Sequence, residues 1–190
     1  ADDAAVDGEP FASDLQETIQ YTFVEWLVRE LPYEIRDTGN QDALGPLYEA
    51  LPDIDRVELN GAITVQYQEN GEEHRSQESF DVVLRDRMGN PLIVANLNQS
   101  RQPASQSMME SLISAAQRVG ESKGSLAGAF LVTSSFFEPE AMEAAADATG
   151  SGLLSRDKRE SFVKLSRKDG FHLCLVEARE EKFNLSVPEI

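Results

Sequence analysis

Asp81, Asn96 and Asn98 are the residues whose types and spacing come closest to a site that could do chemistry. Asp81 lies in the apolar segment SFDVVL, and the triplet Asn96-Leu97-Asn98 ends the apolar segment LIVANLN fifteen residues further on. Alternate residues of a strand share a face, so we expect Asn96 and Asn98 to lie on a face shared with Asp81. Carboxylate and amide oxygens can bind Mg²⁺, but one carboxylate alone makes a poor Mg²⁺ site.

A structural interpretation of the same three residues stays open. Asp and Asn are common where a sheet meets a loop, because their short polar side chains hydrogen-bond to nearby backbone groups. Asp81 lies near the start of one apolar segment and Asn98 ends the next. The spacing alone does not choose between a polar site for a ligand and a pair of backbone caps.

The segment before these strands has the period of an amphipathic helix. Ser13 and Gln16 match a capping box, and Pro32 marks the end of the pattern. The apolar residues between them recur on one face: Leu15, Ile19, Phe23, Trp26 and Leu27. We expect one long helix here and a shorter helix around residues 41–51.

The rest of the chain alternates between strand and helix patterns. We expect strands over 57–68, 78–87 and 91–98, joined by turns at Asn70-Gly71 and Met88-Gly89-Asn90. A helix over 104–121, a buried strand over 126–134 and a helix over 138–149 follow. Further strands are expected over 161–167, 171–177 and 182–187.

This order of elements, with Asp81 on the second strand and a polar triplet ending the third, resembles the restriction-endonuclease-like, or PD-(D/E)XK, nuclease superfamily. The segment GAFLVTSSFFEPEA, residues 128–141, is similar to the strand-to-helix passage of its Mrr-like branch. The resemblance covers about residues 13–149. It implies an α/β fold with an α-β-β-β-α-β core, in which helices flank a mixed central sheet and extra strands follow at the C-terminus.

The resemblance also implies where a catalytic site would lie. Members of the superfamily carry two carboxylates that bind Mg²⁺ and a Lys that stabilises developing charge, and Asn96 and Asn98 stand here at the second carboxylate and the Lys. The first hypothesis is therefore a catalytically degenerate nuclease-like domain without a cofactor. Such a domain would act as a binding or scaffolding module. It could be one part of a longer protein.

An active Mg²⁺-dependent DNA endonuclease with a rearranged site is the alternative. Asp81 would then bind the metal together with an acid from the first helix, Glu17 or Glu25. Arg101 or Lys123 would supply the missing cation. Arginine is an imperfect substitute, because its broad guanidinium keeps its proton and lacks the compact charge of an ammonium.

Charge is the most pronounced global feature, with 34 acidic against 17 basic residues and a net charge of −17. The acids are spread along the whole chain, as in haloarchaeal proteins, and an acidic surface of this kind suits a cytoplasm rich in salt. Binding to a cationic partner would instead concentrate the acids in one block. We therefore expect a halophilic, cytoplasmic protein, whose partner is DNA at high salt or another protein domain.

Basic residues gather in one stretch, which makes it the candidate for contacts with phosphate or an acidic partner: Arg156, Lys158, Arg159, Lys164, Arg167 and Lys168. Arg101 is a further candidate. A solvated face is the competing interpretation, because Asp157 and Glu160 lie among these residues.

The remaining features favour a single intracellular domain over residues 11–190, preceded by an acidic arm or linker over residues 1–10. No apolar stretch is long enough to span a membrane, and no glycine-rich loop indicates a nucleotide cofactor. The single cysteine, Cys174, lies in an apolar run and is expected to be a buried thiol. His74, in an expected polar turn, and His172 lack the neighbours that a zinc site needs.

Overall fold

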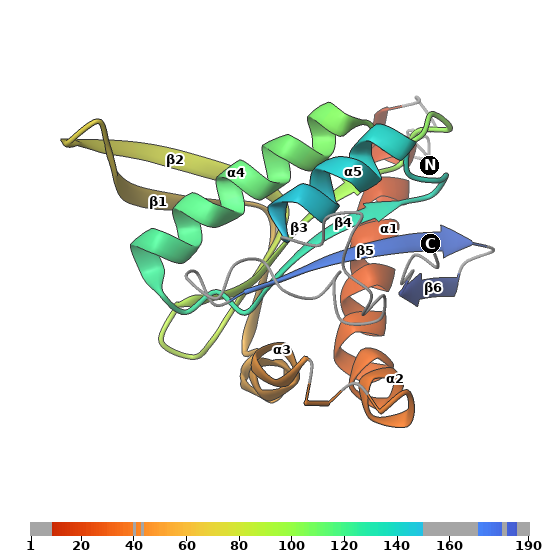
Figure 1. Cartoon of the computed structure of the whole chain (residues 1–190). Coiled ribbons are helices and arrows are strands. Elements are labelled where there is room, and N and C mark those ends of the chain that lie inside the picture. The colour runs from red at the N-terminus through yellow and green to blue at the C-terminus, as the bar shows by residue number, and fades with distance from the viewer. Residues whose placement is uncertain (1–8, 40, 43, 150–170, 180–181, 186–190) are drawn as a thin grey trace, which may run out of the picture.

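A six-stranded mixed sheet forms the centre of the molecule (Figure 1). The computed structural model describes residues 9–39, 41–42, 44–149, 171–179 and 182–185. The helices are α1 (Glu9–Arg29), α2 (Leu31–Asp37), α3 (Gly45–Ala50), the 3₁₀ turn η1 (Leu51–Asp53), α4 (Gln106–Lys123) and α5 (Pro139–Ala148). The strands are β1 (Arg56–Glu69), β2 (Glu72–Arg85), β3 (Pro91–Asn98), β4 (Gly128–Thr133), β5 (His172–Arg179) and β6 (Lys182–Leu185).

The strands lie in the sheet in the order in which they occur in the chain. β1, β2 and β3 form an antiparallel meander, as the turn signals predict. β4 then runs parallel to β3, and β5 runs parallel to β4. The 18-residue helix α4 connects β3 to β4, because a parallel pair needs a crossover connection. The predicted mixed α/β architecture with flanking helices is confirmed at this level.

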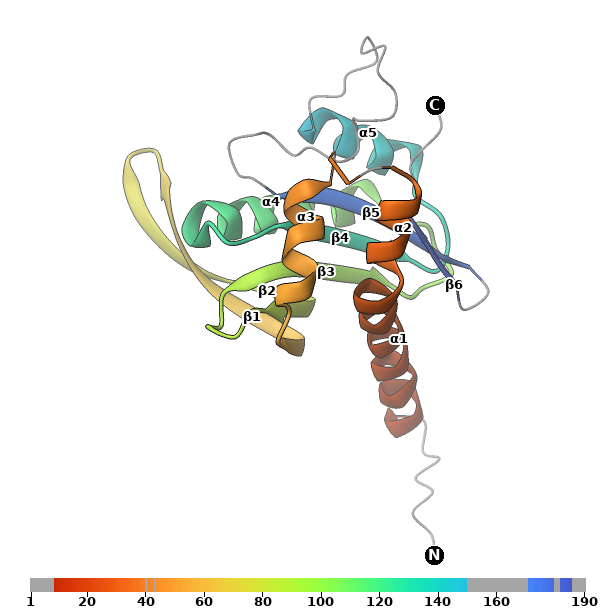
Figure 2. The same cartoon turned by 90° about the horizontal axis from the view of Figure 1, so that it is seen from below.

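Helices cover both faces of the sheet, so the sheet has a core on each side (Figures 1 and 2). The core under α4 and α5 contains Met109, Leu112 and Ala145 together with Leu131 of β4. The core on the opposite face contains residues of α1, α2 and α3, such as Phe23, Ile35 and Leu47. All six residues of β4 are buried, as the apolar run from Ala129 to Val132 predicts for a strand covered on both faces.

The first helix differs from its prediction at both ends. It begins at Glu9, so Ser13 and Gln16 lie inside the helix and the predicted capping box does not form its N-terminus. It ends at Arg29, and Pro32 belongs to the first turn of α2. Proline is tolerated there, because the first turn of a helix has no internal partner for its N–H groups. Pro32 therefore marks the start of a second helix as well as the end of the first.

The second strand begins six residues earlier than predicted. β1 and β2 pair from Arg56↔Arg85 to Glu69↔Glu72 around the two-residue turn Asn70-Gly71, whose φ angles are 54° and 81°. Positive φ at both positions gives the turn that matches the twist of a hairpin. His74, expected in a polar turn, therefore lies in β2, where its ring stacks on that of Tyr67 with centroids 5.6 Å apart.

The far half of this hairpin, residues 62–79, extends beyond the other strands and is called the arm below (Figure 1). It rests on α4 along one face. Arg118 of α4 forms an ion pair with Glu78 at 3.2 Å, and its guanidinium lies 5.2 Å from the centre of the Tyr67 ring. The backbone N–H of Gln66 donates to Ser122 Oγ at 3.0 Å. A lone two-stranded ribbon is only marginally stable, so these contacts hold the arm in place.

β2 ends at Arg85, two residues before its predicted end. Asp86 Oδ1 accepts hydrogen bonds from the backbone N–H groups of Met88 and Asn90 at 2.9 and 2.8 Å, and this closes the turn into β3. The Asn90 side chain donates to the other carboxylate oxygen, and these bonds lower the pKa of Asp86. A side chain that binds its own backbone in this way ends a strand.

Cys174 is buried in β5, as predicted, and its burial raises the pKa of the thiol to about 12. Because the thiolate is the reactive form, we expect the native chain to resist alkylating and disulfide reagents. Denaturant should make Cys174 react at the rate of a free thiol. Labelling with 5,5′-dithiobis(2-nitrobenzoate) in native and denaturing buffer tests this expectation, and rapid labelling of the native chain would contradict it.

Some predictions lie wholly outside the described residues, or almost so: the acidic N-terminal segment over 1–10, the strand over 161–167 and the basic stretch that includes Arg156, Lys158 and Arg159. The predicted helix around 41–51 and the predicted strand over 182–187 are described in part. Within the part that is described, β5 and β6 lie at or close to their predicted positions. None of the helices described combines the length and the apolar character needed to cross a bilayer.

Candidate functional site

Asp81 and Asn96 meet at the point where β2 and β3 separate. The ladder between the two strands runs from Arg85↔Pro91, through a register shift at Leu84, to Val82↔Ala95. In this register Asp81 and Asn96 are the next opposing residues. Their side chains replace the backbone bonds of the ladder. The N–H of Asp81 donates to Asn96 Oδ1 at 3.2 Å, and the N–H of Leu97 donates to Asp81 Oδ2 at 2.7 Å. The two predicted site residues therefore act as a reciprocal clasp between strands.

β1 bends sharply beside this clasp. Asn60 has φ 52°, and a Cβ added to Gly61 would lie 2.9 Å from Val83 Cγ2 and 3.2 Å from Glu58 Cβ. Because glycine has no Cβ, the backbone of β1 at Gly61 can approach the side chain of Val83 this closely. The bend turns the arm away from the rest of the sheet (Figure 1). Asn60 and Asp81 lie between the paired residues Leu59↔Val82 and Gly61↔Phe80, so they face each other across β1 and β2.

Gln20 of α1 hydrogen-bonds to the backbone of the clasp. Its Nε2 donates to the backbone oxygen of Asp81 at 2.9 Å and lies 3.5 Å from Asn60 Oδ1. The side chain is only 1% exposed, and its Oε1 has no hydrogen-bond partner among the described residues. The Nε2 bond ties α1 to the backbone of β2 at Asp81.

Sequence reasoning did not identify Gln20 or Asn60. A signal for Gln20 was present, because it stands at helical spacing from Phe23 and Leu27 and so interrupts an apolar stripe. A polar residue in a buried stripe needs a partner from another element. Asn60 carries no comparable signal, since its role depends on a bend that only the folded sheet reveals.

Asn98 is 6% exposed, and its side chain holds the loop after β3 (residues 99–105) against β4. Its Nδ2 donates to the backbone oxygen of Gln102 at 2.9 Å and to Thr133 Oγ1 at 3.2 Å. Its Oδ1 accepts from Ser100 Oγ at 2.8 Å and lies 3.3 Å from Ser100 N. Both donors and the acceptor are therefore engaged inside the protein. Among the described residues, Asn98 therefore bonds to Ser100, Gln102 and Thr133, whereas Asp81 and Asn96 bond to each other's strands.

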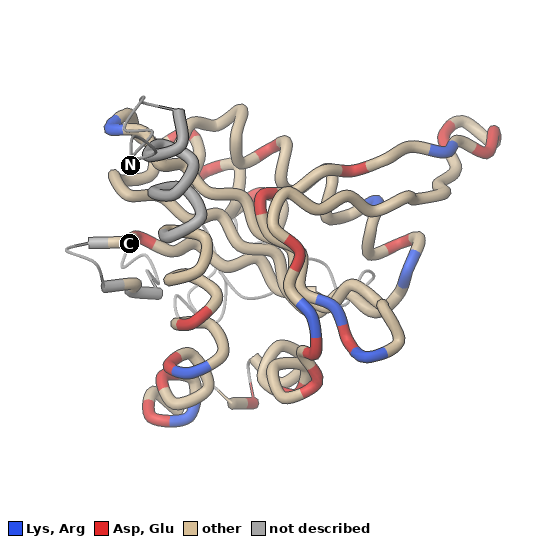
Figure 3. Tube along the Cα trace, turned by 180° about the vertical axis from the view of Figure 1, so that it is seen from behind, with Lys and Arg blue, Asp and Glu red and all other residues tan. Residues whose placement is uncertain are grey.

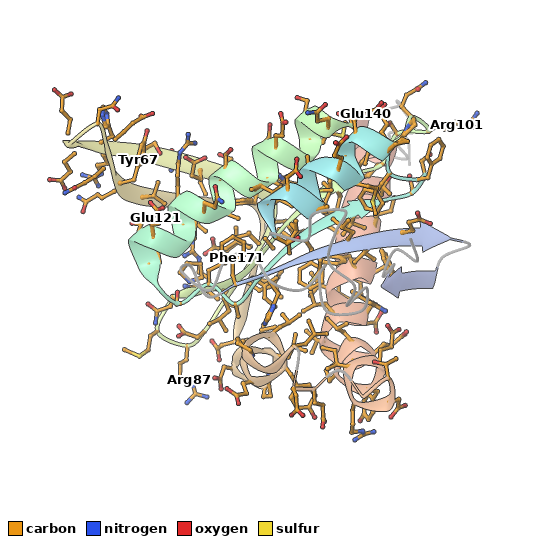
Figure 4. The ribbon with its side chains drawn as sticks, viewed as in Figure 1. Tyr67, Arg87, Arg101, Glu121, Glu140 and Phe171 are labelled. Carbon is orange, nitrogen blue, oxygen red and sulfur yellow. The ribbon has the colours of Figure 1, made fainter. Side chains whose placement is uncertain are left out.

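The other predicted site residues do not join the clasp within the described part. Glu17 lies in α1, but its side chain is outside the described residues. Glu25 forms an ion pair with Arg29 at 3.1 Å on the outside of α1. Arg101 is exposed in the loop after β3 (Figure 4), and Lys123 is exposed at the end of α4.

Metal-binding capacity is low in the described residues. No group of three or more His, Cys, Asp or Glu side chains there is close enough to hold a metal ion. Asp81 contributes one carboxylate, of which Oδ2 already accepts the Leu97 N–H. One carboxylate and neutral amide oxygens leave half of the charge of Mg²⁺ uncompensated.

A separate cavity of about 430 Å³ lies between α4 and α5, away from Asp81. Figure 4 shows Glu140, one of its residues, at the N-terminal end of α5. Its lining includes four acids and no base: Gln106, Glu110, Ile113, Ser114, Glu140, Glu143, Ala144, Asp147 and Ala148. Four carboxylates repel phosphate and other anions, so this cavity does not suit a nucleotide or a nucleic acid.

Comparison with known proteins gives one match. The family described as a domain of unknown function (DUF7527) matches residues 1–190. No curated protein and no solved structure gives a significant match. Because the match spans the whole sequence, the chain is a member of the DUF7527 family.

Proposed function

We propose that this domain has a restriction-endonuclease-like core that does not hydrolyse nucleic acid, and that it serves as a binding or scaffolding module. The order of elements supports the core: α1, an antiparallel meander of three strands, the crossover helix α4 and the parallel strand β4. Asp81 on the second strand faces Asn96 on the third, as the resemblance leads one to expect.

The clasp between Asp81 and Asn96 is the observation that argues against hydrolysis. Phosphodiester cleavage of this type needs a metal held by at least two acids and a cation for the developing charge. Asn96 is neutral, and its oxygen accepts the Asp81 N–H. Asn98 is neutral and buried at the position of the cation. The residues at the catalytic positions are therefore used to hold strands and a loop together.

A protein is the partner that the charge distribution favours. Binding to DNA or RNA depends on Lys and Arg contacts to phosphates. Figure 3 shows Asp and Glu spread over the helices, the strands and the arm, with fewer Lys and Arg among them. The full chain has twice as many acidic as basic residues. Another protein meets this surface at a lower electrostatic cost than a polyanion does.

A cleavage assay tests the absence of hydrolysis. Double-stranded and single-stranded DNA and RNA are incubated with the chain in molar KCl containing Mg²⁺ or Mn²⁺. We expect no more cleavage than with the Asp81→Asn variant, which keeps an acceptor for Leu97 N but has no charge. Metal-dependent cleavage by the wild-type chain that Asp81→Asn abolishes would refute the proposal. Asp55→Asn, an exposed acid outside the clasp, controls for a contaminating nuclease.

A further inference from the structure

Along the arm, the edge of β2 on the side of β3 has no partner strand among the described residues. The ladder between β2 and β3 ends at Val82, and towards the tip β1 is the one strand among the described residues that pairs with β2. Glu69 and Glu72 flank a two-residue turn, so they form a hydrogen-bonded pair and the pairs alternate from there. Glu73, Arg75, Gln77 and Ser79 therefore direct their backbone N–H and C=O groups away from β1. A row of free backbone groups is a template for another strand.

The side chains on this edge carry two opposite charges. Glu73 and Arg75 are exposed, and both lie on the face of the arm opposite His74, whose ring stacks on Tyr67. Their cross-strand neighbours on β1 are the neutral residues Gln68 and Gln66. None of the ion pairs among the described residues includes Glu73 or Arg75. The two charges are thus available to a partner.

We propose that two copies of this chain pair through the β2 edges of their arms, antiparallel and centred on His74. In this register Glu73 of each copy lies opposite Arg75 of the other, which gives two attractive pairs. A register centred on Arg75 places like charges opposite each other, and so does one centred on Glu73. Both Glu73 and Arg75 also present their backbone groups to the partner, so each cross-strand pair exchanges two hydrogen bonds.

The arm explains how two such acidic chains approach each other. Each chain has a net charge of −17, and Figure 1 shows the tip of the arm extending past the end of α4 and beyond the remaining strands. Eight strand residues beyond Phe80 span about 26 Å at roughly 3.3 Å per residue. The Debye length at physiological salt is about 8 Å, so pairing at the tips leaves the two bodies screened from each other. A twofold contact of this kind is self-complementary and closes as a dimer.

Sedimentation equilibrium tests the pairing, at the lowest salt concentration that preserves the circular dichroism of the fold. The contact is short, so we expect weak, concentration-dependent dimers of the wild-type chain. Glu73→Arg and Arg75→Glu each turn two attractive pairs into two repulsive ones, and each should weaken self-association by about tenfold or more. The double variant Glu73→Arg with Arg75→Glu keeps opposite charges across the contact and should restore dimers.

A mixture of the two single variants gives the sharpest result. One variant carries two cations on this edge and the other carries two anions, so the mixture should form heterodimers although neither forms homodimers. Glu69→Arg on β1 changes the net charge equally but lies off the paired edge, and it should leave dimerisation unchanged. A monomeric wild-type chain at all concentrations, or single variants that associate as the wild type does, would overturn the proposal. The pairing does not depend on whether the domain hydrolyses nucleic acid.

Discussion

Replacing Asp81 by Ala is expected to lower the free energy of unfolding by about 2 kcal/mol, because the N–H of Leu97 loses a charged acceptor. That hydrogen bond is 2.7 Å long and lies where the ladder between β2 and β3 ends. Asp81→Asn keeps a neutral acceptor and should cost about half as much. Urea denaturation followed by circular dichroism measures both losses.

Asp55→Ala is the matched control for this prediction. Asp55 is an exposed acid whose ion pair with Arg87 has a long separation of 3.8 Å. Exposed pairs of this kind contribute little, so the control should change stability by less than about 0.5 kcal/mol. An Asp81→Ala chain as stable as the wild type, or more stable, would contradict the clasp. That result is typical of a carboxylate kept for catalysis at the expense of stability.

Replacing Asn98 by Lys should have an even larger effect, with a loss of about 3 kcal/mol or more. The side chain is 6% exposed and packs against Thr133, which is fully buried. Lysine can neither accept the hydrogen bond from Ser100 nor leave its ammonium in water at this position. Thermal or urea unfolding of the variant measures the loss.

Gln99→Lys provides the matched control for Asn98→Lys. Gln99 is the next residue along the chain and is only partly buried, so its replacement adds the same charge at an accessible position. It should cost less than about 1 kcal/mol. If Asn98→Lys were as mild as the control, the loop would accommodate a cation. The acid-x-Lys triplet of the nucleases could then be restored by substitution at Asn96 and Asn98.

The order of elements was predictable because local patterns agree with the fold. β3 has the predicted bounds, since Gly89 and Asn90 mark a turn before it and an uninterrupted apolar run follows. The start of β2 was missed because Glu72 to Gln77 contain no apolar residue. These residues are extended because β1 pairs with them and α4 supports the arm. Neither contact produces a recognisable pattern in the sequence of residues 72–77.

The candidate site was predictable only as a set of residues. The predicted strands over 78–87 and 91–98 correctly place Asp81 and Asn96 on neighbouring strands, but they do not reveal that the two side chains bond to backbone. Asn98 is separated from them in function, because Gln102 and Thr133 take its donors. These partners come from a loop and from a strand 35 residues away. The sequence therefore could not distinguish a ligand site from a pair of backbone caps, because the distinction depends on hydrogen-bond partners that only the folded structure brings together.

Mg²⁺-dependent stability tests most directly whether Asp81 serves the fold or a metal. The free energy of unfolding is measured for the wild-type chain and for Asp81→Asn, with and without Mg²⁺, at constant ionic strength. Mg²⁺ that binds the native state at Asp81 would add stability only to the wild type, whereas binding elsewhere on the acidic surface stabilises both chains. We predict the same increment for the two chains. An increment larger in the wild type by more than about 1 kcal/mol would show a metal site at Asp81 and contradict the structural role of the clasp.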